Sequence, residues 1–151
     1  MDVALLSRPE TTEAVKRGAA RLLAALGYAA VAEAPLPNGR RADLMALGPK
    51  GEIWIVEVKS SLEDFRTDGK WPEYQPYCDS FSFAVGPDFP REVLPPEPGL
   101  ICADAFGGAV LRPAPVTPLA PARRKALTLG FARLAALRCG AAAPLTALRA
   151  G

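Results

Sequence analysis

Four apolar residues in the first part of the chain recur at helical spacing. They are Val15, Ala19, Leu22 and Leu26. This stripe predicts a helix that Thr11 or Thr12 can cap at its start. Gly27 follows the last apolar residue and predicts the end of the helix, because glycine is common just past a helix C-terminus.

Short apolar runs separated by Gly and Pro predict strands in the next part of the chain. The four longer ones are Tyr28–Glu33, Arg41–Leu47, Ile53–Lys59 and Ser80–Val85. Two shorter strands are expected at Leu100–Ala103 and Ala109–Arg112, turned at Gly107-Gly108. Proline-rich segments at 86–99 and 113–121 connect the later elements.

Two more helices are expected outside the strands. The polar segment 60–70 is part loop and part helical turn, and Pro72 can open a short helix that ends near Asp79. A longer helix is expected from Ala122 to Arg138. Its buried stripe repeats at i, i+4 and i+7 and consists of Leu127, Phe131 and Leu134.

The expected order of elements is helix, three strands, helix, strand, then a small β-hairpin and a C-terminal helix. Hairpins combined with helical connections indicate an α/β fold with a mixed sheet. A chain of 151 residues suits one domain. We therefore expect a single domain over 1–151, with its core at about 11–86 and a C-terminal extension at 99–140.

The strand IWIVEVK, Ile53–Lys59, is the strongest strand signal, and it becomes charged toward its end. Because side chains alternate along a strand, Glu57 and Lys59 point to the same face about 7 Å apart. The three-residue turn Pro49-Lys50-Gly51 is a favoured hairpin connection, and it fixes the register with the preceding strand. In that register Asp43 lies opposite Glu57.

Two carboxylates directly opposite each other repel unless a cation lies between them. Oxygen ligands of this kind suit Mg²⁺ or Mn²⁺. Lys59 adds a positive charge that can position water or offset charge on a reacting phosphate. The alternative is an ordinary surface salt-bridge cluster of Asp43, Glu57 and Lys59, and the residues alone leave both interpretations open.

The sequence contains no histidine, which excludes several classes of enzyme. Ser-His-Asp triads, HExxH zinc sites and nucleases with a histidine base are ruled out. The cysteines Cys78, Cys102 and Cys139 lie far apart and form no CxxC pair, so we expect reduced thiols and no zinc site.

The net charge of +2 hides an uneven distribution. Residues 1–111 carry all 16 acidic side chains. Residues 112–151 carry no acid and seven basic residues, which are Arg112, Arg123, Arg124, Lys125, Arg133, Arg138 and Arg149. Such a segment suits a polyanion such as DNA. The alternative is a solvated helix that compensates the acidic part of the chain.

Membrane association is not expected. No apolar run approaches the roughly 18–20 residues that a membrane span needs. The first ten residues, MDVALLSRPE, lack the basic start and apolar stretch of a signal peptide. We therefore expect a soluble, cytoplasmic protein.

The sequence resembles the PD-(D/E)XK nuclease superfamily at Ala42–Asp43 and Glu57–Lys59, where alanine replaces the motif's proline. The core of that superfamily is restriction-endonuclease-like, with the order α-β-β-β-α-β. More narrowly, nearly the whole chain resembles the MmcB-like bacterial DNA-repair proteins. The segments that carry this likeness are GRRAD (39–43), IVEVKSSLEDFRTDGKWPEY (55–74), CDSFSFAV (78–85), GLICADAFG (99–107) and ARRKALTLGFARLAALR (122–138).

The resemblance implies metal-dependent hydrolysis of DNA phosphodiester bonds in a repair context, with Mg²⁺ or Mn²⁺ as cofactor. Asp43 and Glu57 would hold the metal with the Val58 backbone carbonyl, and Lys59 would orient the attacking water. The superfamily often adds a carboxylate from its first helix, for which Glu13 is the best candidate. A solvated acid in the first helical turn is the alternative for Glu13.

Basic and aromatic residues after the ExK strand predict contacts with DNA. They are Arg66, Lys70, Trp71 and Tyr74, although the two aromatics can instead be core residues. From the basic segment we expect DNA contacts at Arg123, Arg124 and Lys125. Asp79 is either an acid that supports the site or a turn former.

Two functions compete at this point. The leading hypothesis is a Mg²⁺-dependent DNA nuclease that acts in DNA repair. The alternative is a DNA-binding repair accessory protein that keeps the fold and cleaves nothing. DNA is the expected partner, and other DNA-repair proteins or a second copy in a homodimer stay open.

Overall fold

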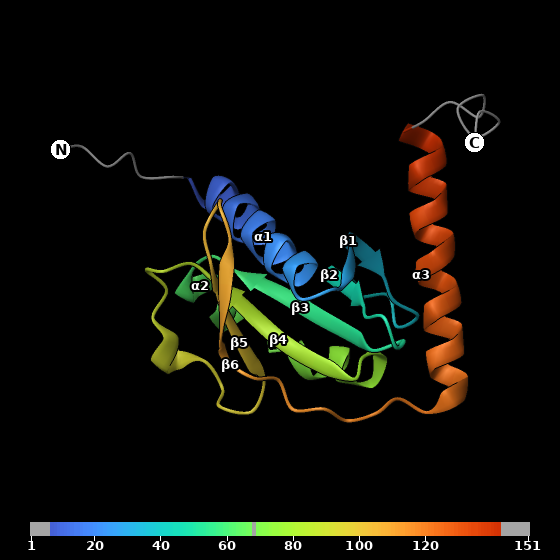
Figure 1. Ribbon diagram of the computed structural model, residues 1–151. Helices are drawn as coiled ribbons and strands as arrows, with labels where there is room; N and C mark the ends of the chain where they lie inside the picture. The colour runs from blue at the N-terminus through green and yellow to red at the C-terminus, as the bar shows by residue number, and fades with distance from the viewer. Residues whose placement is uncertain (1–6, 68, 143–151) are drawn as a thin grey trace.

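The computed structural model describes residues 7–67 and 69–142, in which a six-stranded sheet carries helices on both faces (Figure 1). The helices are α1 (Arg8–Ala25), α2 (Leu62–Thr67) and α3 (Pro121–Ala142), with the 3₁₀ helices η1 (Trp71–Tyr77) and η2 (Arg91–Val93). The strands are β1 (Ala29–Pro35), β2 (Arg41–Leu47), β3 (Ile53–Lys59), β4 (Ser80–Val85), β5 (Gly99–Ala103) and β6 (Gly108–Arg112).

The strands follow one another across the sheet in chain order. The pairs β1–β2, β2–β3 and β5–β6 are antiparallel, whereas β3–β4 and β4–β5 are parallel. The mixed sheet expected from the sequence is confirmed. The β5–β6 hairpin extends this same sheet, because β5 pairs with β4.

Alternation along β3 divides the core into two layers. Trp54, Val56 and Val58 face α1 and pack with its residues Val15 and Leu23. Burying a side chain of this size contributes about 1.5–3 kcal/mol. The opposite face packs a second cluster built around Ile53, Ile55, Phe81, Phe83, Leu127 and Phe131. Both faces of the sheet are therefore covered.

Helix α1 starts earlier than the sequence analysis predicts. Ser7 and Glu10 form a capping box, in which the Glu10 N–H donates to Ser7 Oγ (3.3 Å) and the Ser7 N–H donates to Glu10 Oε2 (2.8 Å). The Thr11 and Thr12 hydroxyls lie inside the helix and donate to the carbonyls of Ser7 and Arg8. The predicted threonine cap is therefore wrong, since a reciprocal cap was available upstream.

The segment between β3 and β4 forms two short helical pieces. Ser61 caps α2, because its Oγ accepts a hydrogen bond from the Asp64 N–H (3.1 Å). The short helix predicted from Pro72 is a 3₁₀ helix, η1, that contains Pro76. Each proline removes a backbone donor, which disfavours a regular α-helix here.

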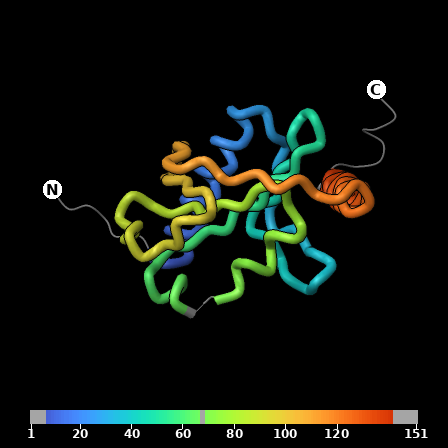
Figure 2. The backbone as a smooth tube through the Cα atoms, turned by 90° about the horizontal axis from the view of Figure 1, so that it is seen from below, coloured from blue at the N-terminus to red at the C-terminus, as the bar shows by residue number. Residues whose placement is uncertain are grey.

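Helix α3 follows a long linker and lies beside the β1–β2 edge of the sheet (Figures 1 and 2). Leu127 and Phe131 are buried and Leu134 is half-buried, which confirms the predicted stripe. Leu129 and Leu137 on the same helix are exposed. The helix is therefore held along one narrow face.

Candidate functional site

The β2–β3 hairpin has the register that its turn predicts. The Gly48 N–H donates to the Glu52 carbonyl (2.8 Å), and Gly51 has the positive φ of 89° that this loop requires. Paired residues run from Leu47↔Ile53 to Leu44↔Val56. The next position in this register after Leu44↔Val56 has Asp43 opposite Glu57.

Beyond Leu44↔Val56, side chains take over the hydrogen bonds between the two strands. The Asp43 N–H donates to Glu57 Oε1 (2.9 Å), and the Val58 N–H donates to Asp43 Oδ2 (2.8 Å). The N–H and C=O of one residue point to the same side of a strand, so the Val58 carbonyl also faces Asp43. Two carboxylates and a carbonyl therefore converge where the strands part.

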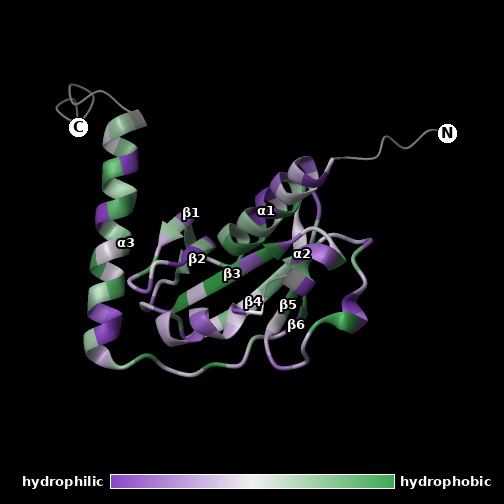
Figure 3. Cartoon of the chain, turned by 180° about the vertical axis from the view of Figure 1, so that it is seen from behind, coloured by the Kyte–Doolittle hydropathy of each residue, from purple (hydrophilic) through white to green (hydrophobic). Residues whose placement is uncertain are grey.

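The charged end of β3 is inside the protein. Glu57 is 5% exposed and Lys59 is 6% exposed, while Asp43 is half-buried. Figure 3 shows polar positions interrupting the apolar length of β3 near its end. These exposures exclude the interpretation of the three residues as an ordinary surface salt-bridge cluster.

Burial and mutual repulsion change the protonation of the two acids. Burial raises the pKa of Glu57 to about 9, and the charge of Asp43 raises it as well, whereas Lys59 opposes the shift. The pKa of Asp43 is also raised, chiefly by burial. The two carboxyl groups lie close enough to repel each other when both are charged, so a proton shared between them is favoured over two negative charges.

The residues at this point fit a hard divalent cation in the chemistry of their donors. Asp43, Glu57 and the Val58 carbonyl offer oxygen ligands, which Mg²⁺ and Mn²⁺ prefer. A cation there would take the place of the shared proton and remove the repulsion between the carboxylates. No group of three or more His, Cys, Asp or Glu residues within the described ranges is placed to hold a metal.

Glu13 does not join the pair. Its side chain is 66% exposed on α1 and lies 3.9 Å from the Lys16 ammonium. Lys16, which the sequence analysis did not single out, is only 14% exposed and forms an ion pair with Glu33. Its charge acts on Asp43. Nothing in the local sequence marks Lys16, because its partner comes from β1.

Glu33 is the centre of a charged group beside the pair. Its backbone has a positive φ of 52°, which is unusual for a residue other than glycine. The hydrogen bond from Lys16 is the main reason that the pKa of Glu33 is lowered, and the charges of Arg41 and Arg138 add to the effect. Arg41 and Arg138 were absent from the predicted site.

The structure separates the residues predicted to contact DNA. Trp71 is half-buried and stacks on Phe81 with ring centroids 5.7 Å apart, so its ring is part of the core. Tyr74 is buried and also stacks on Phe81. Arg66 and Lys70 are exposed in the α2–η1 segment. Of the predicted residues that follow β3, these two basic ones are open to solvent.

The basic residues at the start of α3 lie far from the acidic pair. The Arg124 guanidinium donates to the Gly51 carbonyl (2.8 Å) at the β2–β3 turn. Six residues of strand separate that turn from Glu57, or about 20 Å. Arg123 and Lys125 are exposed at this distant end, and Arg149 lies outside the described residues.

Asp79 is a structural anchor. Its carboxylate accepts hydrogen bonds from the Ile53 N–H (2.8 Å), the Leu119 N–H (2.9 Å) and the Arg124 guanidinium (2.7 Å). Desolvation would raise its pKa, but these hydrogen bonds, led by Arg124, outweigh it and lower the pKa to about 2. Asp79 and Arg124 therefore tie α3 to the sheet, which leaves Arg124 engaged.

The three cysteines are unpaired thiols, as expected. Cys78 is buried, and desolvation raises its pKa to about 12. A buried thiol that stays protonated is a poor nucleophile. Cys102 is half-buried and Cys139 is exposed.

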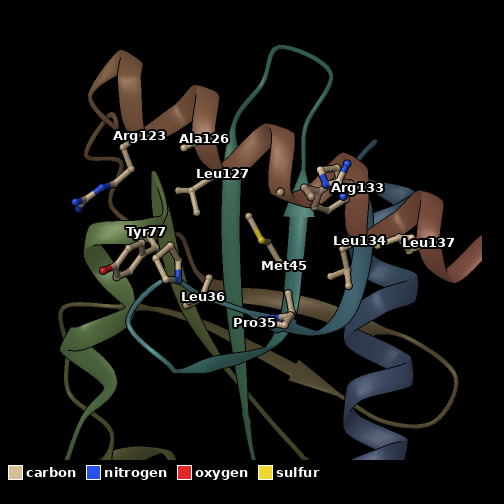
Figure 4. A pocket seen from close by; sticks show the side chains of 14 residues that line it. Pro35, Leu36, Met45, Tyr77, Arg123, Ala126, Leu127, Arg133, Leu134 and Leu137 are labelled. Atoms are coloured by element: carbon tan, nitrogen blue, oxygen red, sulfur yellow. The ribbon is translucent and has the colours of Figure 1, made fainter.

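A separate apolar groove of about 650 Å³ lies between α3 and the β1–β2 edge (Figure 4). The groove is lined by apolar residues that include Leu36, Met45, Leu127 and Leu134, and by the basic residues Arg123 and Arg133. Asp43, Glu57 and Lys59 are not part of this groove. The acidic pair is therefore a distinct feature of the molecule.

The fold and the buried pair define the class of the molecule. It is a mixed α/β protein whose order of elements is consistent with a restriction-endonuclease-like core. The family described as "DNA repair protein MmcB-like" matches residues 3–145. The chain belongs to the MmcB-like family of DNA repair proteins.

A solved structure is similar over most of the chain. It is described as the SPO1766 protein of unknown function from Silicibacter pomeroyi, with 48% sequence identity and a TM-score of 0.83. The likeness covers 87% of this chain and 90% of that one. A comparison with curated proteins found no match. In the described part of the chain, no helix has the length and apolar character needed to cross a membrane.

Proposed function

We propose that this chain is a divalent-metal-dependent DNA nuclease of the PD-(D/E)XK kind that acts in DNA repair. The observation that carries the proposal is the burial of Glu57 and Lys59 on β3 beside the half-buried Asp43. Burying ionisable groups costs several kcal/mol for each charge unless a partner compensates it. A cation site explains why two acids are kept together in this place.

Asp43, Glu57 and the Val58 carbonyl would hold the metal. Mg²⁺ or Mn²⁺, when bound, polarises a phosphate oxygen and lowers the pKa of a water molecule. The chain contributes the orientation of its ligands. Backbone N–H groups of Val58 and Asp43 hold the two carboxylates in position before any substrate arrives.

Lys59 would act on the reacting groups themselves. The Lys59 side chain is on the same face of β3 as Glu57, and the residue is buried, so solvent screens its charge little. It can donate a hydrogen bond that orients the attacking water, and its charge offsets the charge that develops on the phosphate. A group fixed in this way stabilises a transition state without having to reorganise.

A cleavage assay on the full chain tests the proposal. Single-stranded, duplex and branched DNA are incubated with Mg²⁺ or Mn²⁺, and we expect cleavage of at least one substrate that EDTA stops. Asp43→Asn and Glu57→Gln should abolish it, and Lys59→Met should lower turnover by roughly 10²–10³. Glu92→Gln, an exposed acid in η2, is the matched control. Absence of cleavage with every substrate, or full activity of the two acid variants, contradicts the proposal.

One observation favours the second candidate, a DNA-binding repair protein that does not cleave. No third acidic side chain joins Asp43 and Glu57 among the residues that the structure describes. The same panel separates the two functions, since retention of DNA on a gel without cleavage supports the accessory role. DNA repair is common to both.

A further inference from the structure

Three basic side chains from three different elements meet at Glu33. Lys16 of α1 forms an ion pair with the Glu33 carboxylate, and Arg41 Nε of β2 lies 2.8 Å from Glu33 Oε2. Arg138 of α3 donates from Nη2 to the Glu33 backbone carbonyl (2.8 Å) and from Nη1 to the Ala32 carbonyl. We call Lys16, Arg41 and Arg138 the basic cluster.

The basic cluster lies next to the acidic pair. In the β1–β2 register, Ala32 pairs with Leu44 and Ala34 pairs with Ala42, so Glu33 falls at the level of Asp43. Both Glu33 and Lys16 act electrostatically on Asp43. The cluster therefore borders the place where a scissile phosphate would sit.

The path of α3 explains how Arg138 reaches this place. Arg124 is tied to the β2–β3 turn, and fourteen helical residues separate it from Arg138, or about 21 Å. That length is close to the distance from the turn to Glu57 along β3. The helix therefore carries a basic side chain from the far end of the hairpin to the level of the acidic pair.

The cluster carries more positive charge than Glu33 neutralises, and part of it faces water. The Arg41 side chain is 67% exposed, and Arg138 is also exposed. Glu13, the next acid, approaches only Lys16 and is itself 66% exposed. Glu33 thus holds cations in place and leaves the two guanidinium groups accessible.

We propose that Lys16, Arg41 and Arg138 form a phosphate-binding site for the backbone of a DNA strand that enters beside Asp43 and Glu57. This inference rests on the proposed function and names how its substrate is held. Arg41 and Arg138 bind phosphate oxygens through their planar, multiple N–H donors, which suit phosphate. Glu33 positions the cations and competes with the phosphate for them.

A binding experiment without cleavage tests the site. Anisotropy of a labelled oligonucleotide, single-stranded and duplex, is measured with the full chain in EDTA across a salt series. Arg41→Gln and Arg138→Gln should each weaken duplex binding about five- to tenfold and reduce the slope of log K against log salt by about 0.9. Glu33→Gln should tighten binding, because it removes a competing carboxylate. Arg91→Gln, an exposed cation in η2, is the control and should change neither value.

The arginine variants should weaken DNA binding, whereas Glu33→Gln should strengthen it. A purely structural ion-pair network would not produce these opposite changes in affinity. Thermal unfolding of each variant shows whether it is folded, and Glu33→Gln tests the site even if an arginine variant is destabilised. Unchanged affinity and slope in both arginine variants, or weaker binding by folded Glu33→Gln, overturns the inference. Wild type that fails to bind DNA overturns it too. Cleavage is scored separately, so binding through the cluster without cleavage leaves this inference standing while the nuclease proposal fails.

Discussion

Two acidic sites in this protein have opposite surroundings. Asp79 meets an arginine and two backbone N–H donors, which outweigh its desolvation and lower its pKa to about 2. Glu57 meets a second carboxylate in a buried position, and its pKa rises to about 9. Asp79 therefore stabilises the folded chain, whereas Asp43 and Glu57 cost stability until a cation joins them.

Replacing Asp79 by Asn should cost about 2 kcal/mol of unfolding free energy at pH 7, given a shift from 3.8 to about 2 and 1.36 kcal/mol per pKa unit. Because the folded pKa is the lower one, this contribution is full above about pH 4 and disappears as the pH falls toward 2. Urea unfolding at pH 7 and at low pH measures it. Asp88→Asn, at an exposed loop acid, is the control. Equal stability of wild type and Asp79→Asn at pH 7 would contradict the assignment.

The acidic pair predicts the reverse dependence on pH. The folded pKa of Glu57 is about 9 against an ordinary 4.5, so the protonated pair favours folding at low pH and this contribution is lost as the pH rises toward 9. Metal-free wild type should lose thermal stability between pH 5 and 9, and Glu57→Gln should lose less. Melting curves in EDTA show this. If metal-free Glu57→Gln is several kcal/mol less stable than wild type at pH 8, Glu57 is a structural ion-pair partner and the prediction is wrong.

At the scale of elements, the sequence pattern predicts the structure correctly where residues close in the sequence determine it. The alternation of β3 and the glycine at position 51 predicted the hairpin and its register. Ser7 and Glu10 have the residue types and spacing of a capping box, whereas the apolar stripe alone favours a cap at Thr11 or Thr12. The contact between Lys16 and Glu33 joins elements whose relative placement no short sequence pattern determines, so this part of the site needed the structure.

The attachment of α3 through one narrow face gives a matched test. Leu127 is 6% exposed and Leu137 is 66% exposed on the same helix. Leu127→Ala should cost about 2–5 kcal/mol because it leaves a cavity, whereas Leu137→Ala should change stability by less than about 0.5 kcal/mol. Denaturant unfolding of the two variants measures the difference. Similar values for both would mean that α3 is not docked as described.

At the scale of the whole molecule, the basic segment reaches two distant places. Arg123 and Lys125 lie at the start of α3, which Arg124 ties to the β2–β3 turn. Arg138 contacts Glu33, which lies at the level of Asp43. The distance of about 20 Å corresponds to about six base pairs of duplex at 3.4 Å each. With basic residues near both ends of α3, we expect a DNA duplex to lie along this helix.

Duplex length should therefore change the salt dependence of binding. A duplex of about 16 base pairs should give a steeper slope of log K against log salt than a hairpin duplex of about three base pairs, because only the longer duplex spans the about 20 Å between the two ends of α3. The double variant Arg123→Ala and Lys125→Ala should remove that increment. Anisotropy with the two duplexes provides the measurement. If the double variant has the same slope as wild type on the longer duplex, Arg123 and Lys125 do not contact the duplex.

The central claim is that Asp43 and Glu57 form a site for a divalent metal, and a calorimetric titration with Mn²⁺ tests it most directly. Wild type and Lys59→Met should bind Mn²⁺, while Asp43→Asn and Glu57→Gln should not, because each loses a charged oxygen ligand from a site that has few. All four proteins are first shown to be folded by thermal unfolding in EDTA. Wild type that binds no Mn²⁺, or acid variants that bind it as wild type does, would contradict the claim.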